Sequence, residues 1–234
     1  MASGSEALVI DASIEPDVYI DFAKARGCTI RHVLDTHIHA DHLSRSRALS
    51  KCTGATLLLP AQHRVSFPHQ PLEEGTEIHL GTSTLRALRT PGHTLESMCY
   101  LLDGRWLFTG DTLFLAGVGR PDLEANADEA KARALLLHAS LMRLLDLDSK
   151  LLVLPAHANA PIAFDREPVA ATLAVVRASV LLPENAERFA DHVLGRIPAT
   201  PPNHQLIVGF NEAGESPPGD PTDLEAGANR CAVS

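Results

Sequence analysis

Short apolar runs bounded by polar residues recur along the chain, and each run is typical of a buried strand. They predict strands at residues 7–11, 29–34, 55–59, 77–80, 84–88, 98–102, 105–109 and 151–154. Two pairs of neighbouring runs are close enough to form hairpins. The first hairpin would turn at Gly81, and the second at Asp103-Gly104, a dipeptide that favours a tight turn.

Apolar residues at helical spacing predict further helices between and after these strands. One covers 16–26 and ends at Gly27, a long one covers 128–147, and two more lie near 168–181 and 183–194. The first has apolar residues at Val18, Tyr19, Phe22 and Ala23. The long helix is expected to present an apolar face of Leu135, Leu136, Leu141 and Leu144.

Strands alternating with hairpins and helices are typical of a layered α/β domain. We expect a single catalytic domain over residues 1–214. Residues 215–234 form a tail rich in Pro, Gly and acidic residues, and we expect the chain to fray after an apolar patch at 205–210.

The composition is that of a globular protein, since 45% of the 234 residues are apolar and 21% are charged. The net charge of −9 argues against a nucleic-acid or anionic-membrane partner, because both need a positive surface. The sequence has neither a membrane-length apolar stretch nor a signal-peptide pattern, which predicts a cytoplasmic protein. Its four cysteines include no CxxC pair, as expected in a reducing compartment.

Histidine carries the strongest chemical signal. Residues 37–42 read His-Ile-His-Ala-Asp-His and follow a predicted strand, so three imidazoles and a carboxylate share one loop. His93, Asp111 and His157 also follow predicted strands. Ligands bind at strand ends in α/β folds, and imidazole together with carboxylate suits zinc, iron or manganese better than calcium. We therefore expect a metal site.

The order of these residues resembles the metallo-β-lactamase superfamily over residues 7–157. The resemblance implies an αββα sandwich, in which helices face two mixed sheets and the metals lie at one sheet edge. In a member with two metals, the first ion would be held by His37, His39 and His93. The second would be held by Asp41, His42 and His157, with Asp111 as the bridging ligand.

Members of this superfamily normally begin with one or two strands before the segment that matches residues 7–11, whereas six residues precede it here. We therefore expect the first sheet to lack an N-terminal edge strand, or the N-terminus to be shortened. An exposed edge leaves the oligomeric state open, with a homodimer as one alternative.

Local context resembles one branch of the superfamily, the persulfide dioxygenases of sulfur metabolism. The segments that carry this resemblance are 90–97, 110–114 and 117–123, and 189–214 resembles the end of that catalytic domain. The branch implies one Fe(II) per chain, held by His37, His93 and Asp111 as a facial triad. The implied reaction oxidises a low-molecular-weight persulfide, with glutathione persulfide expected, using O₂ to give sulfite and a thiol.

The same resemblance implies supporting roles for other residues. Near the iron, the ligands would be hydrogen-bonded and oriented by His39, Asp41, His42 and His157. Of these four residues, Asp41 and His42 are expected to take part in catalysis. Arg120 is also expected to take part in catalysis and, together with Asp122, to bind the substrate, with a structural ion pair between the two as the alternative. Glutathione-using relatives often carry a tyrosine where this chain has Leu154, which leaves the thiol carrier open.

Two other functions stay open. A glyoxalase-II-type hydroxyacylglutathione hydrolase would hold two Zn(II) with the same seven ligands and cleave a glutathione thioester. The short C-terminal part, which lacks an obvious basic helical module for binding glutathione, argues against this function. A non-catalytic partner-binding module is disfavoured because decayed members would be expected to lose metal ligands.

Overall fold

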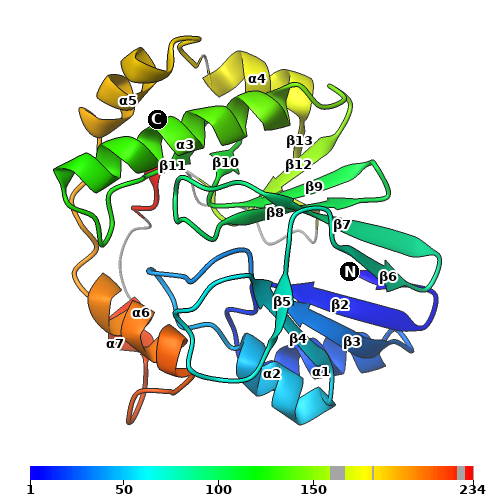
Figure 1. The fold of residues 1–234 in the computed structure, drawn as a ribbon. Helices are drawn as coiled ribbons and strands as arrows, with labels where there is room; N and C mark the ends of the chain where they lie inside the picture. Colours follow the sequence, from blue (N-terminus) through cyan, green and yellow to red (C-terminus); the bar gives the residue numbers. More distant parts are fainter. Residues whose placement is uncertain (159–166, 181, 226–229, 234) are drawn as a thin grey trace. The chain divides into compact units, whose positions relative to one another are not determined.

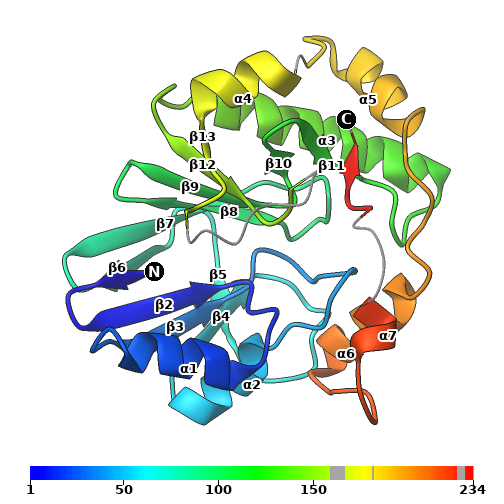
Figure 2. The same cartoon turned by 180° about the vertical axis from the view of Figure 1, so that it is seen from behind.

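The computed structural model describes residues 1–158, 167–180, 182–225 and 230–233, and the chain divides into two compact units. The first unit comprises Met1–Ala87 and Pro202–Gly227, and the second comprises Leu88–Pro201 and Ala228–Ser234. Figures 1 and 2 show the elements of each unit from opposite sides.

The first unit is built on a five-stranded sheet in the order β1-β2-β3-β4-β5. Its strands are β1 (Ala2–Ser3), β2 (Glu6–Ile10), β3 (Thr29–Leu34), β4 (Thr56–Pro60) and β5 (Gln70–Leu72). From β2 to β5 neighbouring strands are parallel, while β1 is antiparallel to β2. At the N-terminal edge, where we expected a strand to be missing, the structure therefore has a strand of two residues.

Helices α1 (Pro16–Lys24) and α2 (Ser46–Thr53) pack against β3 on one face of this sheet (Figure 1). Pro16 is compatible with the first turn of a helix because its missing N–H has no partner there. Of the apolar residues predicted on α1, Val18 and Phe22 are more than half exposed. The unit also contains the strand β6 (Glu77–Leu80) and the helices α6 (His204–Ala213) and α7 (Thr222–Glu225).

Strand β7 (Ser83–Arg89) runs from the first unit into the second. The second unit contains a sheet that includes β8 (Met98–Leu102), β9 (Trp106–Gly110), β12 (Leu152–Pro155) and β13 (Ala171–Thr172). A smaller antiparallel sheet comprises β10 (Leu113–Phe114), β11 (Gly117–Gly119) and β14 (Ala232–Val233). The predicted β8–β9 hairpin is confirmed, and its turn residues Asp103 and Gly104 have φ of 50° and 60°.

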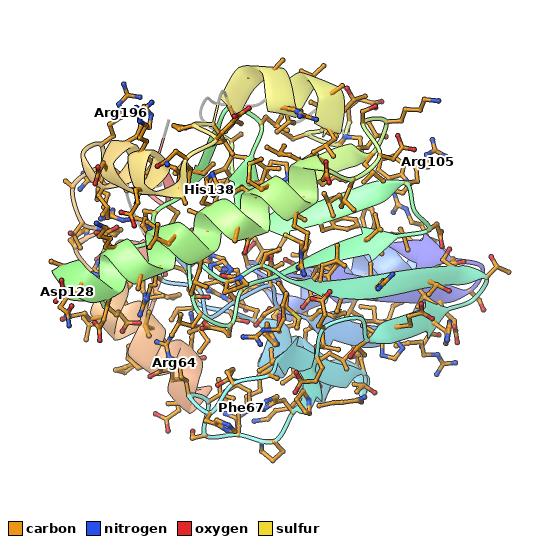
Figure 3. All side chains as sticks on the ribbon, turned by 45° about the horizontal axis from the view of Figure 1, so that its top comes forward. Arg64, Phe67, Arg105, Asp128, His138 and Arg196 are labelled. Atoms are coloured by element: carbon orange, nitrogen blue, oxygen red, sulfur yellow. The ribbon has the colours of Figure 1, made fainter. Side chains whose placement is uncertain are left out.

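The long predicted helix is confirmed as α3 (Ala127–Leu145), which starts with a capping box formed by Asn126 and Glu129. It packs against α5 (Ala186–Leu194), and His138, labelled in Figure 3, donates to the Pro183 carbonyl oxygen at 3.0 Å. The prediction of its apolar face is wrong at one position, because Leu136 is 41% exposed and its neighbour Leu137 packs in the core instead.

Two other parts of the chain differ from expectation. The helix expected near 168–181 is shorter, because Ala171–Thr172 pairs with β12 and α4 spans Leu173–Val180; Leu181 lies outside the described residues. The C-terminal part does not fray throughout, since α6, α7 and β14 all lie within it. None of the helices among the described residues is long and apolar enough to cross a membrane.

Candidate metal centre

The loop that follows β3 carries the first group of candidate ligands. Strands β2, β3 and β4 are parallel, so their carboxyl ends lie at one edge of the first unit's sheet, where this loop begins. His37 and His39 are 2% and 0% exposed. Asp41 and His42, farther along the loop, are half-buried.

Asp11, the residue after β2, orients the two buried histidines. Its carboxylate accepts hydrogen bonds from the Thr36 backbone N–H (2.7 Å), the Thr36 hydroxyl (2.9 Å) and Nε2 of His39 (3.1 Å). Because the Thr36 hydroxyl donates its proton to Asp11, it accepts from Nδ1 of His37, 2.9 Å away. These bonds make Nε2 of His37 and Nδ1 of His39 the nitrogens that would offer a lone pair to a metal, which for His39 requires the ring to give up its second proton.

Charge strengthens the pairing of Asp11 with His39. Burial alone lowers the pKa of His39, but the neighbouring Asp11 carboxylate raises that pKa to about 10. Burial raises the pKa of Asp11 in turn, and the His39 ring outweighs this effect and holds it below its usual value. Asp35, also buried, has a raised pKa and accepts from the hydroxyls of Ser44 and Ser46 at 2.7 and 2.5 Å.

Two buried ring nitrogens test whether this loop fits a metal ion. Among the described residues, Nδ1 of His39 and Nε2 of His42 have no hydrogen-bond partner. The opposite nitrogen of each ring donates to a carboxylate, that of Asp11 for His39 and that of Asp41 for His42, both at 3.1 Å. The side chains of His39, Asp41 and His42 offer ligand atoms that lie within 4.8 Å of one another. A cation would satisfy the buried nitrogens, so the loop fits a metal ion.

The second unit holds another group of candidate ligands. Asp111 follows β9, and His157 follows β12, which is parallel to β9 with Pro155 opposite Gly110. Nε2 of His157 lies 3.2 Å from one carboxylate oxygen of Asp111, and Nε2 of His93 lies 3.7 Å from the other. The Asp111 side chain is fully buried. The two imidazoles thus converge on one carboxylate, as metal ligands do.

The backbone around His93 fixes the position of its ring. Its Nδ1 donates to the carbonyl oxygen of Arg120 at 2.8 Å, so its Nε2 is the nitrogen available to a metal. Gly92 has φ of +146°, and a Cβ there would lie 2.4 Å from Cα of Leu137 on α3. A Cβ at Gly119 would lie 2.0 Å from the Asp111 carbonyl oxygen. These two glycines allow α3 and β11 to approach the ligand residues closely.

Arg120, which we expected to bind the substrate, is held by hydrogen bonds within the second unit. This residue is fully buried, and its guanidinium binds the Asp122 carboxylate through two hydrogen bonds of 2.8 and 2.7 Å. Its remaining nitrogen donates to the carbonyl oxygens of Ala199 and Arg230. All three guanidinium nitrogens therefore have hydrogen-bond partners within the unit. This arrangement contains the ion pair between Arg120 and Asp122 that we considered as the alternative to substrate binding.

Of the residues predicted from the sequence, His39, Asp41 and His42 lie together in the first unit, and His93, Asp111 and His157 lie together in the second. The assignment of His37, His93 and Asp111 to one ion stays a prediction. Sequence reasoning missed the roles of Asp11 and Asp35. Their signal was an acidic residue at the end of one predicted strand, residues 7–11, and directly after another, residues 29–34.

We compared the chain with known families, curated proteins and solved structures, and the matching family model covers all of the candidate ligands. Residues 1–157 match the family model described as the metallo-beta-lactamase superfamily. The chain is similar to hydroxyacylglutathione hydrolases from Methylobacillus flagellatus (40% identity over 49% of this chain and 46% of the relative) and Methylococcus capsulatus (36% identity over 73% and 66%). It thus spans less than two thirds of the length of these curated relatives.

Solved structures match over more of the chain. A metallo-beta-lactamase from Staphylococcus aureus aligns with a TM-score of 0.82 at 25% identity, over 91% of this chain and 68% of its own. A structure described as ETHE1 from Myxococcus xanthus aligns with a TM-score of 0.78 at 29% identity, over 92% of both chains. The fold of this chain is therefore the metallo-β-lactamase fold, with mixed sheets and helices.

Proposed function

Because this chain belongs to the metallo-β-lactamase superfamily, we propose that it is an Fe(II)-dependent persulfide dioxygenase acting on glutathione persulfide or a similar small persulfide. One observation carries the choice of reaction. The likeness to ETHE1, a persulfide dioxygenase, covers 92% of both chains, whereas the two hydroxyacylglutathione hydrolases extend well beyond the matched region.

In this proposal His37, His93 and Asp111 hold one iron as a facial triad. The hydrogen bonds at Nδ1 of His37 and His93 support it, because each leaves Nε2 to the metal. Asp111 supplies a buried carboxylate. In this proposal His39, Asp41, His42 and His157 would orient the ligands by hydrogen bonding, and Asp41 and His42 would exchange protons with the substrate.

A bound Fe(II) supplies the O₂ chemistry that protein side chains lack. The overall reaction converts a persulfide RSSH, O₂ and water into the thiol RSH, sulfite and two protons. The sulfane sulfur is oxidised by four electrons, O₂ is reduced by the same four, and the S–S bond breaks by hydrolysis. Asp41 and His42, which are half-buried and joined at 3.1 Å, are the groups we assign to hold and release the protons.

A second candidate is a dizinc thioester hydrolase. It is favoured by the names of the curated relatives and by the buried nitrogens of His39 and His42, which would both be ligands in a two-metal site. The two candidates differ in the number of metal ions and in the need for O₂.

The test is to load metal-free protein with either Fe(II) or Zn(II) under anaerobic conditions and to give each form both substrates. We expect the iron form to consume O₂ and produce sulfite from glutathione persulfide, and neither form to hydrolyse S-lactoylglutathione quickly. His93→Ala should abolish sulfite formation, while His192→Ala, which changes an exposed histidine of α5, should leave it unchanged. Rapid thioester hydrolysis by the zinc form, with no sulfite from the iron form, would favour the hydrolase.

A further inference from the structure

The ligand loop of the first unit is held by a side chain far along the chain. Asn211 lies in the last turn of α6, and its Nδ2 donates to the carbonyl oxygens of His39 (2.8 Å) and His42 (2.9 Å). Its Oδ1 accepts from the backbone N–H of Ser44 at 2.8 Å. A single amide group thus satisfies three backbone groups of one loop, with both of its donors and its acceptor engaged.

This bonding matters because the loop contains neither helix nor strand that would fix its backbone. Backbone polar groups at such a site need side-chain partners, and the positions of those partners then set the course of the chain. A second partner follows Asn211 in sequence: the Glu225 carboxylate of α7 accepts from the Leu43 N–H at 2.7 Å and binds the Arg45 guanidinium. Both contacts lie within the first unit.

We propose that Asn211 is a positioning residue for the metal-ligand loop, acting through the backbone of residues 39–44. The proposal rests on the proposed function in that the loop holds a metal ion. Asn211 touches no ligand atom. It sets where the side chains of His39, Asp41 and His42 lie, and so how well the loop binds a cation.

The test compares two asparagines of the same helix. Asn211→Asp keeps the acceptor for Ser44 but loses both donors. Asn203, the residue before the first turn of α6, donates to the carbonyl oxygens of Asp223 and Leu224 on α7 and not to the loop itself, so Asn203→Asp is the matched control. Metal-free samples of all three proteins are titrated with Co(II) alone, and the visible absorption of the bound ion is recorded.

We expect the Co(II) dissociation constant to rise about 10–100-fold in Asn211→Asp, with a changed absorption spectrum, and to stay within about threefold of wild type in Asn203→Asp. Equal affinity in Asn211→Asp and wild type, or an equal loss in both variants, would overturn the proposal. Wild-type protein that binds no Co(II) would instead contradict the proposed function. If Asn211→Asp does not fold, Asn211→Ala, which adds no charge, is expected to give the same weakening.

Discussion

At the scale of single residues, Arg120 makes buried contacts that tie several parts of the second unit together. Its side chain is fully buried and paired with Asp122, and its backbone carbonyl oxygen accepts from His93. One residue thus joins the C-terminal strand region, through Arg230, to a candidate metal ligand. A buried pair of this kind is costly to break from one side, because the remaining charge loses its partner.

We therefore predict that Arg120→Met lowers the free energy of unfolding by about 3 kcal/mol, toward the low end for a buried pair because Asp122 is partly exposed. Denaturant titration measures the change. Arg105→Met, which removes an exposed arginine above Trp106, should cost less than about 0.5 kcal/mol. If Arg120→Met is as stable as this control and has a raised KM for persulfide, the prediction is contradicted, and the result would indicate that Arg120 binds the substrate.

At the scale of elements, packing of α3 determines where His93 lies. The helix passes so close to Gly92 that only a residue without Cβ fits, and Ser140 on the same helix donates to the Pro91 carbonyl oxygen at 2.8 Å. The loop before His93 is thus held by a helix that belongs to the unit's core. Stability and ligand geometry depend on the same contact.

Gly92→Ala should therefore cost about 3 kcal/mol of unfolding free energy, since it combines a disfavoured backbone conformation with a clash against the backbone of Leu137. Gly104→Ala provides the control. That residue also has positive φ, but a Cβ there would meet nothing within 4 Å, so we expect a loss of about 1 kcal/mol. Similar losses in both variants, measured by thermal or denaturant unfolding, would show that the close approach of α3 contributes nothing.

The short helix α7 contributes a pH-dependent contact. Burial raises the pKa of Glu225, but its bonds to Arg45 and the Leu43 N–H hold that pKa below the usual value. A carboxyl group with a lowered pKa stabilises the fold above its ordinary pKa of 4.5, and this stabilisation is lost as pH falls through the lowered value.

Glu225→Gln should thus be less stable than wild type by about 1 kcal/mol at pH 7. The difference should shrink as the pH falls below 4.5, when the wild-type carboxylate takes up its proton. Unfolding curves recorded across this pH range measure it, with the exposed Glu215→Gln as the control. A stability difference that is the same at every pH would contradict the role of the charge.

At the scale of the whole molecule, the sequence predicted most strands and the candidate ligands because both leave local signals. A strand such as Leu152–Pro155 is a continuous apolar run, and the candidate ligand His157 follows it closely. Helix α2 left little signal, since Leu49 is its one buried apolar residue with a large side chain. The positioning role of Asn211 could not be predicted, because its partners lie about 170 residues away and are backbone groups.

The central claim, an iron-dependent persulfide dioxygenase, is tested most directly by the metal content of protein purified without oxygen, together with its O₂ uptake when glutathione persulfide is added. We predict about one iron per chain and persulfide-dependent O₂ uptake, as expected for a facial triad. Both should be lost in His93→Ala. Two zinc ions per chain with no O₂ uptake would contradict the account and favour thioester hydrolysis.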